Sequence, residues 1–299
     1  MATVSKALKM QGRDKSSTRQ NTISKIKEIF KTVLIYGQLI FMSTVVLVPI
    51  IWIVGSSFNP GSSLASSSMF PANPTLAHYR ELLTNTNYLI WYRNTFKIAV
   101  IHMTISVFLS TSMGYVFGRF AFKGKKAALL SVLVLQMFPS FMAMTALYVL
   151  FLTFNLLDNH WALILAYAAG QIPMNTWLIK GYLSSIPKEL DESAMLDGAT
   201  KLQIFTKIIF PLIKPIVSFV AVTTFMTPWM DFIFPRLIIS SNSNLTLAVG
   251  LFDMINGNSS NNYTMFAAGA VMVAVPITIA YVGLQKYLIE GITAGASKG

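Results

Sequence analysis

The chain has 299 residues, of which 54% are hydrophobic and only 11% are charged. Because an average soluble domain is about 25% charged, this composition excludes an ordinary water-facing surface and predicts a protein embedded in a lipid bilayer. The absence of cysteine excludes disulfides and thiolate metal sites.

The formal net charge of +12 allows two interpretations. A nucleic-acid-binding protein gathers its basic residues on one face, whereas these residues lie beside the ends of apolar runs, as in cytoplasmic loops of membrane proteins. With the N-terminus inside, few of the 23 basic residues fall in outer segments. Those exceptions are Arg80, Arg93, Lys97 and Arg236. We therefore predict no nucleic-acid partner and a topology in which both termini are cytoplasmic.

Residues 1–31 form a basic arm before the first apolar run. The part up to residue 21 is polar and is expected to be disordered. Ile23, Ile26 and Phe30 then recur at helical spacing among lysines. This pattern is typical of a basic helix lying on the inner leaflet, and a cytoplasmic extension of the first span explains it equally well. A cleaved signal peptide is not expected, because the arm is longer than a usual n-region.

Six segments are apolar enough to cross a bilayer, which takes about 20 residues of helix. Five of them contain no charged residue: Val33–Ser57, Ile98–Phe117, Ala127–Phe154, Trp161–Ile179 and Met265–Gln285. The fifth span in chain order, 212–239, is less clean because it contains Lys214, Asp231 and Arg236. We predict an all-α, six-helix transmembrane domain over residues 32–290 and a cytoplasmic tail over 291–299.

Two outer loops are long. Residues 58–97 contain prolines and glycine that favour irregular or short-helical structure. Residues 240–264 are rich in Asn and Ser, with Gly250 and Gly257 as expected turn points. Loops of this length are usually functional or disordered, and on a transporter they would face an external partner. Prolines inside the spans, Pro139 among them, can kink a membrane helix.

Among the ionisable residues inside predicted spans, His102 and Asp231 are the candidates for a proton relay. Such residues would suit an ion-coupled carrier. Asp231, however, falls near the outer interface and is interpreted as a packing residue, and His102 as a packed or pore-lining residue. A metal site is not predicted, because the remaining histidines, His78 and His160, both lie outside the spans.

The segment 186–211, between the fourth and fifth spans, has the pattern of two short helices with a tight joint. Acidic residues follow Pro187 and favour the positive end of a first helix. Gly198 can take the left-handed conformation that closes this helix. Thr200 and Gln203 have capping-box spacing for a second helix. An ordinary linker needs neither the glycine nor the caps, so the segment is typical of a docking element.

This segment resembles the signature loop of bacterial binding-protein-dependent ABC permeases, which is Glu-Ala-Ala, three residues, Gly, nine residues, Ile-x-Leu-Pro. All of its spacings are kept, and the matching residues are Glu192, Ser193, Ala194, Gly198, Ile208, Phe210 and Pro211. Ser193 stands where alanine is usual and Phe210 where leucine is usual. Both changes preserve approximate helix compatibility or apolar character.

Further stretches resemble the oligosaccharide branch of that family, with MalG-like permeases of maltose/maltodextrin importers as the nearest pattern. These stretches are Thr227–Phe234, Thr246–Leu251, Phe266–Val271 and Gly291–Gly299. The resemblance runs from about Val33 to the C-terminus, without the N-terminal arm.

The resemblance implies a type I ABC importer permease fold in a bacterial cytoplasmic (inner) membrane. It implies a transporter subunit rather than an enzyme, with ATP and Mg on two partner ATPase subunits and no cofactor on this chain. A MalF-like permease subunit and an extracellular solute-binding protein would complete the importer. The cargo would be maltose or maltodextrin; the alternatives are another oligosaccharide, or an ion-coupled secondary sugar carrier.

The resemblance also assigns site residues. Contacts that couple the chain to the ATPase fall on Glu192, Ser193, Ala194, Gly198, Ala199, Ile208 and Pro211. The tail, Lys298 and Gly299, would reach between the ATPases. Asn256, Gly257 and Asn258 would face the binding protein. No catalytic residue is expected.

Overall fold

The computed structural model describes residues 2–63, 68–137, 139–256 and 262–296, and every regular element in these ranges is helical. In chain order the helices are α1 (Ala2–Ser57), α2 (Ala77–Asn85), α3 (Tyr88–Arg119), α4 (Lys125–Leu135), α5 (Ser140–Thr153), α6 (His160–Leu183), α7 (Glu189–Leu196), α8 (Lys201–Gln203), the π-helix η2 (Ile204–Ile209), α9 (Phe210–Met230), α10 (Ile233–Ile238), α11 (Leu247–Asn256) and α12 (Tyr263–Ala296).

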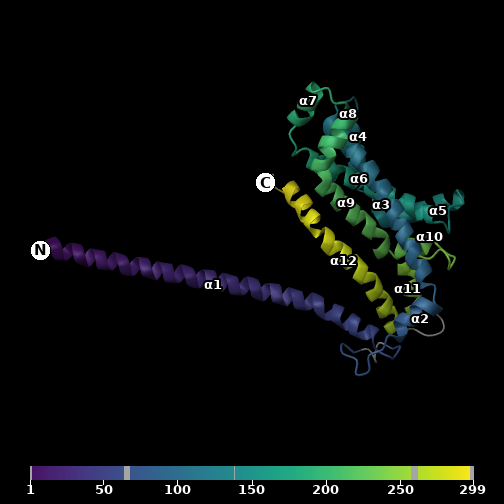
Figure 1. Ribbon diagram of the computed structural model, residues 1–299, viewed down its shortest axis with the longest axis horizontal. Coiled ribbons are helices and arrows are strands. Elements are labelled where there is room, and N and C mark those ends of the chain that lie inside the picture. The colour runs from purple at the N-terminus through teal and green to yellow at the C-terminus, as the bar shows by residue number, and fades with distance from the viewer. Residues whose placement is uncertain (1, 64–67, 138, 257–261, 297–299) are drawn as a thin grey trace.

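Within the described ranges, five helical stretches are long and apolar enough to cross a membrane: Lys27–Ser57, Tyr88–Arg119, His160–Leu183, Lys201–Met230 and Tyr263–Gly283. Helices α3, α6, α9 and α12 pack together into a bundle (Figure 1). Helix α1 packs on α12 and then projects away from the bundle. One end of the bundle carries α7 and α8, and the opposite end carries α2, α10 and α11. We call these the α7 end and the α11 end.

The third predicted span, Ala127–Phe154, is not one helix. It is divided into α4 and α5, with Pro139 at the N-cap of α5 in an extended conformation. Proline lacks the N–H that would continue the helix, which explains the break. Helix α4 lies toward the α7 end and α5 toward α10 (Figure 1). The prediction of a span was wrong in its continuity, while that of an all-α membrane fold was correct.

The N-terminal arm also differs from the expectation. Helix α1 is continuous from Ala2 to Ser57, so the predicted disorder up to residue 21 is wrong. The alternative, a helical extension of the first span, is the one observed. No proline interrupts the chain before Pro49, and once a helix is nucleated each further residue is added at little cost.

The fifth span ends earlier than predicted. Helix α9 stops at Met230, and Asp231 has extended backbone angles before α10 begins. The Asp231 carboxylate accepts the N–H of Phe234 at 3.3 Å, so the aspartate satisfies a donor at the start of the next helix. The predicted span of residues 212–239 is therefore two helices with a joint at Asp231.

The outer loops are more ordered than their composition suggests. Residues 58–97 contain the short helix α2, as predicted, but their last ten residues already belong to α3. Gly250 lies inside α11 rather than at a turn. A Cβ there would lie 2.2 Å from the Trp91 ring, so this glycine allows α11 to approach α3 closely. Gly257 lies outside the described residues.

Candidate functional site

The joint in segment 186–211 forms as the local sequence predicts. Helix α7 ends at Leu196, and Gly198 takes a φ of +83°. The N–H of Gly198 donates to the Met195 carbonyl at 3.0 Å, and the N–H of Ala199 donates to the Ala194 carbonyl at 2.9 Å. These bonds satisfy carbonyls that the helix end leaves open. The turn is therefore fixed by its backbone.

The second helix begins with a complete capping box. The Thr200 hydroxyl accepts the Gln203 N–H at 3.3 Å, and the Gln203 side chain accepts the Thr200 N–H at 2.8 Å. From Lys201 the chain continues as one helical stretch to Met230. The second short helix is thus the first part of a membrane-spanning helix.

A π-helical stretch, Ile204–Ile209, interrupts this long helix and was not predicted. The Phe210 N–H donates to the Phe205 carbonyl, five residues back. Pro211 follows, and it can neither donate to the Lys207 carbonyl nor fit against it. The proline that ends the signature motif thus explains the altered helical pitch, a feature frequent at functional sites.

A buried ion pair anchors the segment to the bundle. Arg119, at the end of α3, places Nε 2.9 Å from Oδ2 of Asp191, and the two side chains are only 7% and 9% exposed. Arg119 also donates from Nη2 to the Ile186 carbonyl at 3.1 Å. Burial raises the pKa of Asp191, and the neighbouring Arg119 opposes that rise. The guanidinium therefore joins the end of α3 both to the residues that precede α7 and to the first turn of α7.

Apolar contacts complete the anchor. Ala194 from α7 and Ile204 from η2 are buried in one cluster with Ile179, Leu183 and Ile213. The opposite face of the segment is exposed. It combines acidic residues with apolar ones: Glu189, Glu192, Asp197, Leu190, Met195, Leu196 and Leu202. Leu196 is 89% exposed. Exposed apolar residues gathered at one site mark interaction surfaces.

The predicted site residues divide between these faces. Glu192, Ser193, Gly198 and Pro211 are exposed, Ala199 and Ile208 are half-buried, and Ala194 is buried. Sequence reasoning missed Arg119 and Asp191. A signal existed, because Asp191 lies three residues before Ala194 and so shares its buried face.

A second polar network fixes residues 238–247 at the α11 end, and we call these residues the outer plate. The Asp158 carboxylate accepts the N–H groups of Ser240 and Ser241 at 3.0 and 2.9 Å. Asn94 donates to the carbonyls of Ser243 and Leu245 at 2.8 and 3.0 Å.

Two further bonds hold the outer plate. The Leu247 N–H donates to the Thr95 hydroxyl at 2.8 Å, and Nε2 of His160 lies 2.8 Å from the Asn244 carbonyl. No sequence pattern indicates this network, because its partners lie far apart in the chain. Burial acts to raise the pKa of Asp158, but its several hydrogen bonds together lower that pKa below the ordinary value.

The remaining predicted residues are less informative. Asn256 is exposed at the end of α11, whereas Gly257, Asn258, Lys298 and Gly299 lie outside the described residues. In the part that the structure describes, no His, Asp or Glu cluster could hold a metal ion.

Among the described residues, the ionisable residues His102 and Asp231 form no ion pair. The Asp231 carboxylate accepts the Tyr167 hydroxyl at 2.9 Å, which ties α6 to the joint between α9 and α10. The His102 ring is buried with its centroid 5.5 Å from that of Tyr167. These contacts fit the packing role expected for Asp231 and, of the two roles expected for His102, the packed one.

Known proteins share this architecture. The family described as "Binding-protein-dependent transport system inner membrane component" matches residues 110–293. The galactooligosaccharides transport system permease protein GanQ of Bacillus subtilis is 43% identical over 92% of this chain and 98% of its own length. The maltodextrin transport system permease protein MdxG of the same organism is 40% identical over 88% and 95%.

A solved structure has the same fold. A chain of the bacterial ABC transporter involved in the import of the acidic polysaccharide alginate superposes with a TM-score of 0.77. It covers 88% of this chain and 97% of its own, at 22% sequence identity. At that identity the likeness concerns the fold. Together with the family match and the curated relatives, it shows that this chain belongs to the binding-protein-dependent transport system inner membrane components, the permease subunits of ABC importers.

Proposed function

We propose that this chain is one of two permease subunits in an ATP-driven oligosaccharide importer, and that segment 186–211 receives the stroke of the ATPase. The observation that carries the proposal is the two-sided construction of α7. One side exposes acidic and apolar residues for a partner. The other side is held by the Arg119–Asp191 ion pair and by the buried Ala194.

Two routes lead from α7 into the bundle. The first runs through the buried ion pair and the Ile186 carbonyl to the end of α3. The second runs through the Gly198 joint and the capped Lys201–Met230 helix. Because a joint with satisfied backbone bonds resists bending, displacement of α7 would move α3 and α9 together. That motion would change which face of the membrane the transport path opens to.

The other assignments follow from this role. Two ATPase subunits would hold ATP and Mg, and this chain would bind no cofactor. A MalF-like permease subunit would complete the path, and a solute-binding protein would dock at the α11 end. Both termini and segment 186–211 would lie on the cytoplasmic side, which agrees with the distribution of basic residues.

Maltodextrin is the first candidate for the cargo, because the motif pattern resembles MalG-like permeases and MdxG is a maltodextrin permease by name. A galactooligosaccharide is the second, because GanQ carries that name and matches more of this chain. Both cargoes are neutral oligosaccharides, so neither needs a charged site in this chain. Uptake of maltotetraose and of a β-linked galactotetraose, each with the cognate binding protein, decides between them.

The test of the function is reconstitution of the chain with its partner subunits in proteoliposomes. We expect ATP hydrolysis to be stimulated by the sugar-loaded binding protein. Uptake should require ATP on the side of the proteoliposome membrane that carries the ATPase subunits. Uptake that persists without ATP and collapses with the proton gradient would establish the ion-coupled carrier instead.

A further inference from the structure

Two adjoining cavities open beside α4 at the α7 end. The first, of about 730 Å³, is lined mainly by apolar atoms and includes Phe122, Leu129 and Leu130. The second, of about 700 Å³, lies between the ends of α3 and α6 and the start of segment 186–211. Lys125 and Leu129 line both cavities. We call the joined cavities the α4 groove.

The charges around this groove are unbalanced. Lys125, Lys126, Lys180 and Lys188 line it, together with one carboxylate, Glu189. Among the described residues no ion pair involves these lysines, and the groove's arginine, Arg119, is paired with Asp191. Nζ of Lys125 donates to the Phe120 carbonyl at 2.9 Å, and Nζ of Lys180 lies 4.8 Å above the Trp177 ring. The groove therefore carries excess positive charge over apolar walls.

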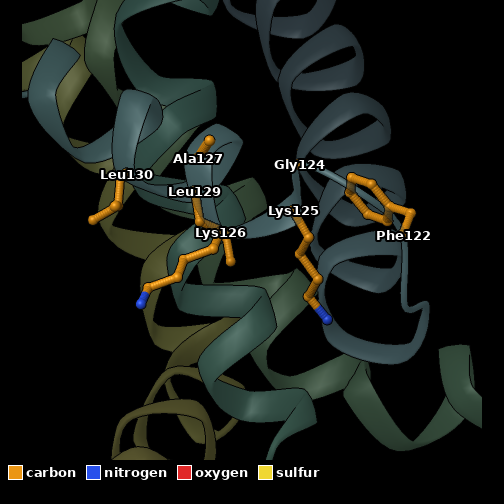
Figure 2. A pocket seen from close by; sticks show the side chains of 7 residues that line it. All are labelled: Phe122, Gly124, Lys125, Lys126, Ala127, Leu129 and Leu130. Carbon is orange, nitrogen blue, oxygen red and sulfur yellow. The ribbon is translucent and has the colours of Figure 1, made fainter.

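The groove lies where the membrane surface is expected. Helix α4 is apolar after its two lysines, and its residues Leu130, Val134 and Leu135 are each more than half exposed. Trp177 and Lys180 on α6 are of the types that mark a membrane interface. Figure 2 shows the side chains of Lys125 and Lys126 leaving the start of α4 in diverging directions, with the amino group of each at the outer end. Their amino groups would thus sit at headgroup level while Leu129 and Leu130 contact hydrocarbon.

We propose that the α4 groove binds an anionic phospholipid of the inner leaflet. The lysines hold the headgroup phosphate, and an acyl chain lies along Leu129 and Leu130. Basic pockets between membrane helices on the cytoplasmic side suit such headgroups, and a charge-assisted contact to phosphate is stronger than a neutral one. The placement at the inner leaflet rests on the proposed function, whereas the groove and its charge do not.

The lipid would act on the coupling element. Ile186, Pro187, Lys188 and Glu189 line the groove and lead directly into α7. A headgroup held between Lys125 and Lys188, which line the same cavity, joins the start of α4 to the residues that precede α7 and so limits the movement of α7 relative to the bundle. Occupancy would therefore increase the fraction of ATPase strokes that reach the permease.

Lipid binding is measured by native mass spectrometry of the complete importer, purified and exchanged into phosphatidylcholine nanodiscs doped with phosphatidylglycerol. Variant Lys125→Gln with Lys188→Gln, which removes two lysines that line the same cavity, is expected to retain phosphatidylglycerol about tenfold less than the parent. Its matched control is Lys27→Gln with Lys123→Gln, which removes the same charge from exposed lysines outside the groove. The control should retain lipid as the parent does, and equal loss in both variants would overturn the site.

Three further measurements distinguish a bound phospholipid from free phosphate and from a protein contact. In proteoliposomes, phosphatidylglycerol should raise the sugar uptake per ATP hydrolysed by the parent and not by the groove variant. If inorganic phosphate restores the parent in pure phosphatidylcholine as well as the lipid does, the lipid assignment is wrong. If the groove variant loses its ATPase subunits in pure phosphatidylcholine, the lysines contact protein instead. Failure of transport by the parent itself would contradict the proposed function and leave lipid retention as a separate result.

Discussion

The two ends of this permease are fixed in opposite ways. At the α11 end, the outer plate accepts a hydrogen bond from Asn94 on α3 and donates hydrogen bonds to Thr95 on α3 and to Asp158 in the loop before α6. At the α7 end, segment 186–211 is held by the Arg119–Asp191 ion pair, by the Arg119 hydrogen bond to the Ile186 carbonyl and by one apolar cluster, and its other face is exposed. The first construction suits a surface that keeps its shape. The second suits a coupling segment that binds a partner and transmits the partner's motion to the bundle. We call segment 186–211 the lever.

The largest effect on this comparison is expected from removing the charged anchor of the lever. Arg119→Ala leaves the buried Asp191 carboxylate without its counter-charge and should destabilise the α7 end by about 3–5 kcal/mol. We expect a lower unfolding temperature for the solubilised importer and a loss of ATP-driven uptake.

Replacing both partners gives the control. The double variant Arg119→Leu with Asp191→Leu removes the charge pair together and should recover most of the stability. Single and double variants with the same unfolding temperature would show that the ion pair does not anchor α7.

At the α11 end, the largest local effect is expected from Thr95→Val. The buried N–H of Leu247 loses its acceptor, which costs about 1–3 kcal/mol. Because the outer plate has other bonds, the protein should fold and lose stimulation by the binding protein more than basal ATP hydrolysis. Thr104→Val, exposed on the same helix and bonded only to its own turn, is the matched control, and equal losses in both would contradict the role of the plate.

A smaller effect is expected from substituting Gly198, at the joint between α7 and the following helix. Gly198 has a φ of +83° and no atom within 4 Å of where a Cβ would lie, so a side chain there meets backbone strain and not a clash. Gly198→Val should cost about 1–2 kcal/mol and reduce uptake per ATP hydrolysed, with normal membrane insertion. Gly198→Asn tolerates the left-handed region better and should retain most of the coupling. Full coupling in the valine variant would show that the joint is not required.

The smallest expected difference between the two ends is in how their stability depends on pH. Although burial opposes it, hydrogen bonding lowers the native pKa of Asp158, so its contribution to stability is present above the usual carboxyl pKa of about 3.9 and is lost as pH falls through the lowered value. The native pKa of Asp191 is raised by burial, so its contribution is present at low pH and is lost as pH rises through the raised value.

Hydrogen exchange from about pH 3 to pH 6, which brackets the usual carboxyl pKa, measures both ends separately. Acid should loosen the outer plate and spare the α7 end. Asp158→Asn should remove the acid sensitivity of the plate, and equal acid sensitivity of plate and α7 end would contradict the two assignments.

The features that could be predicted from the sequence are those set by neighbours in the chain. The positive φ of Gly198, the Thr200–Gln203 capping box and the apolar spans each depend on a few consecutive residues. The Arg119–Asp191 pair joins positions 72 residues apart in the numbering, and the outer plate joins residues 80 or more apart. Periodicity carries no information on such pairs. The break at Pro139 and the π-helix before Pro211 arise from prolines whose presence was visible but whose effect depends on packing.

The central claim is that α7 docks on the ATPase through its exposed face, and a cross-linking measurement tests it most directly. The chain has no cysteine, so Leu196→Cys, at an 89% exposed position, gives a single reactive thiol. In the assembled importer this thiol should cross-link to an ATPase subunit, and the yield should change when ATP is bound. Cross-linking only to the partner permease, or to no subunit of a transport-competent importer, would contradict docking of α7 on the ATPase.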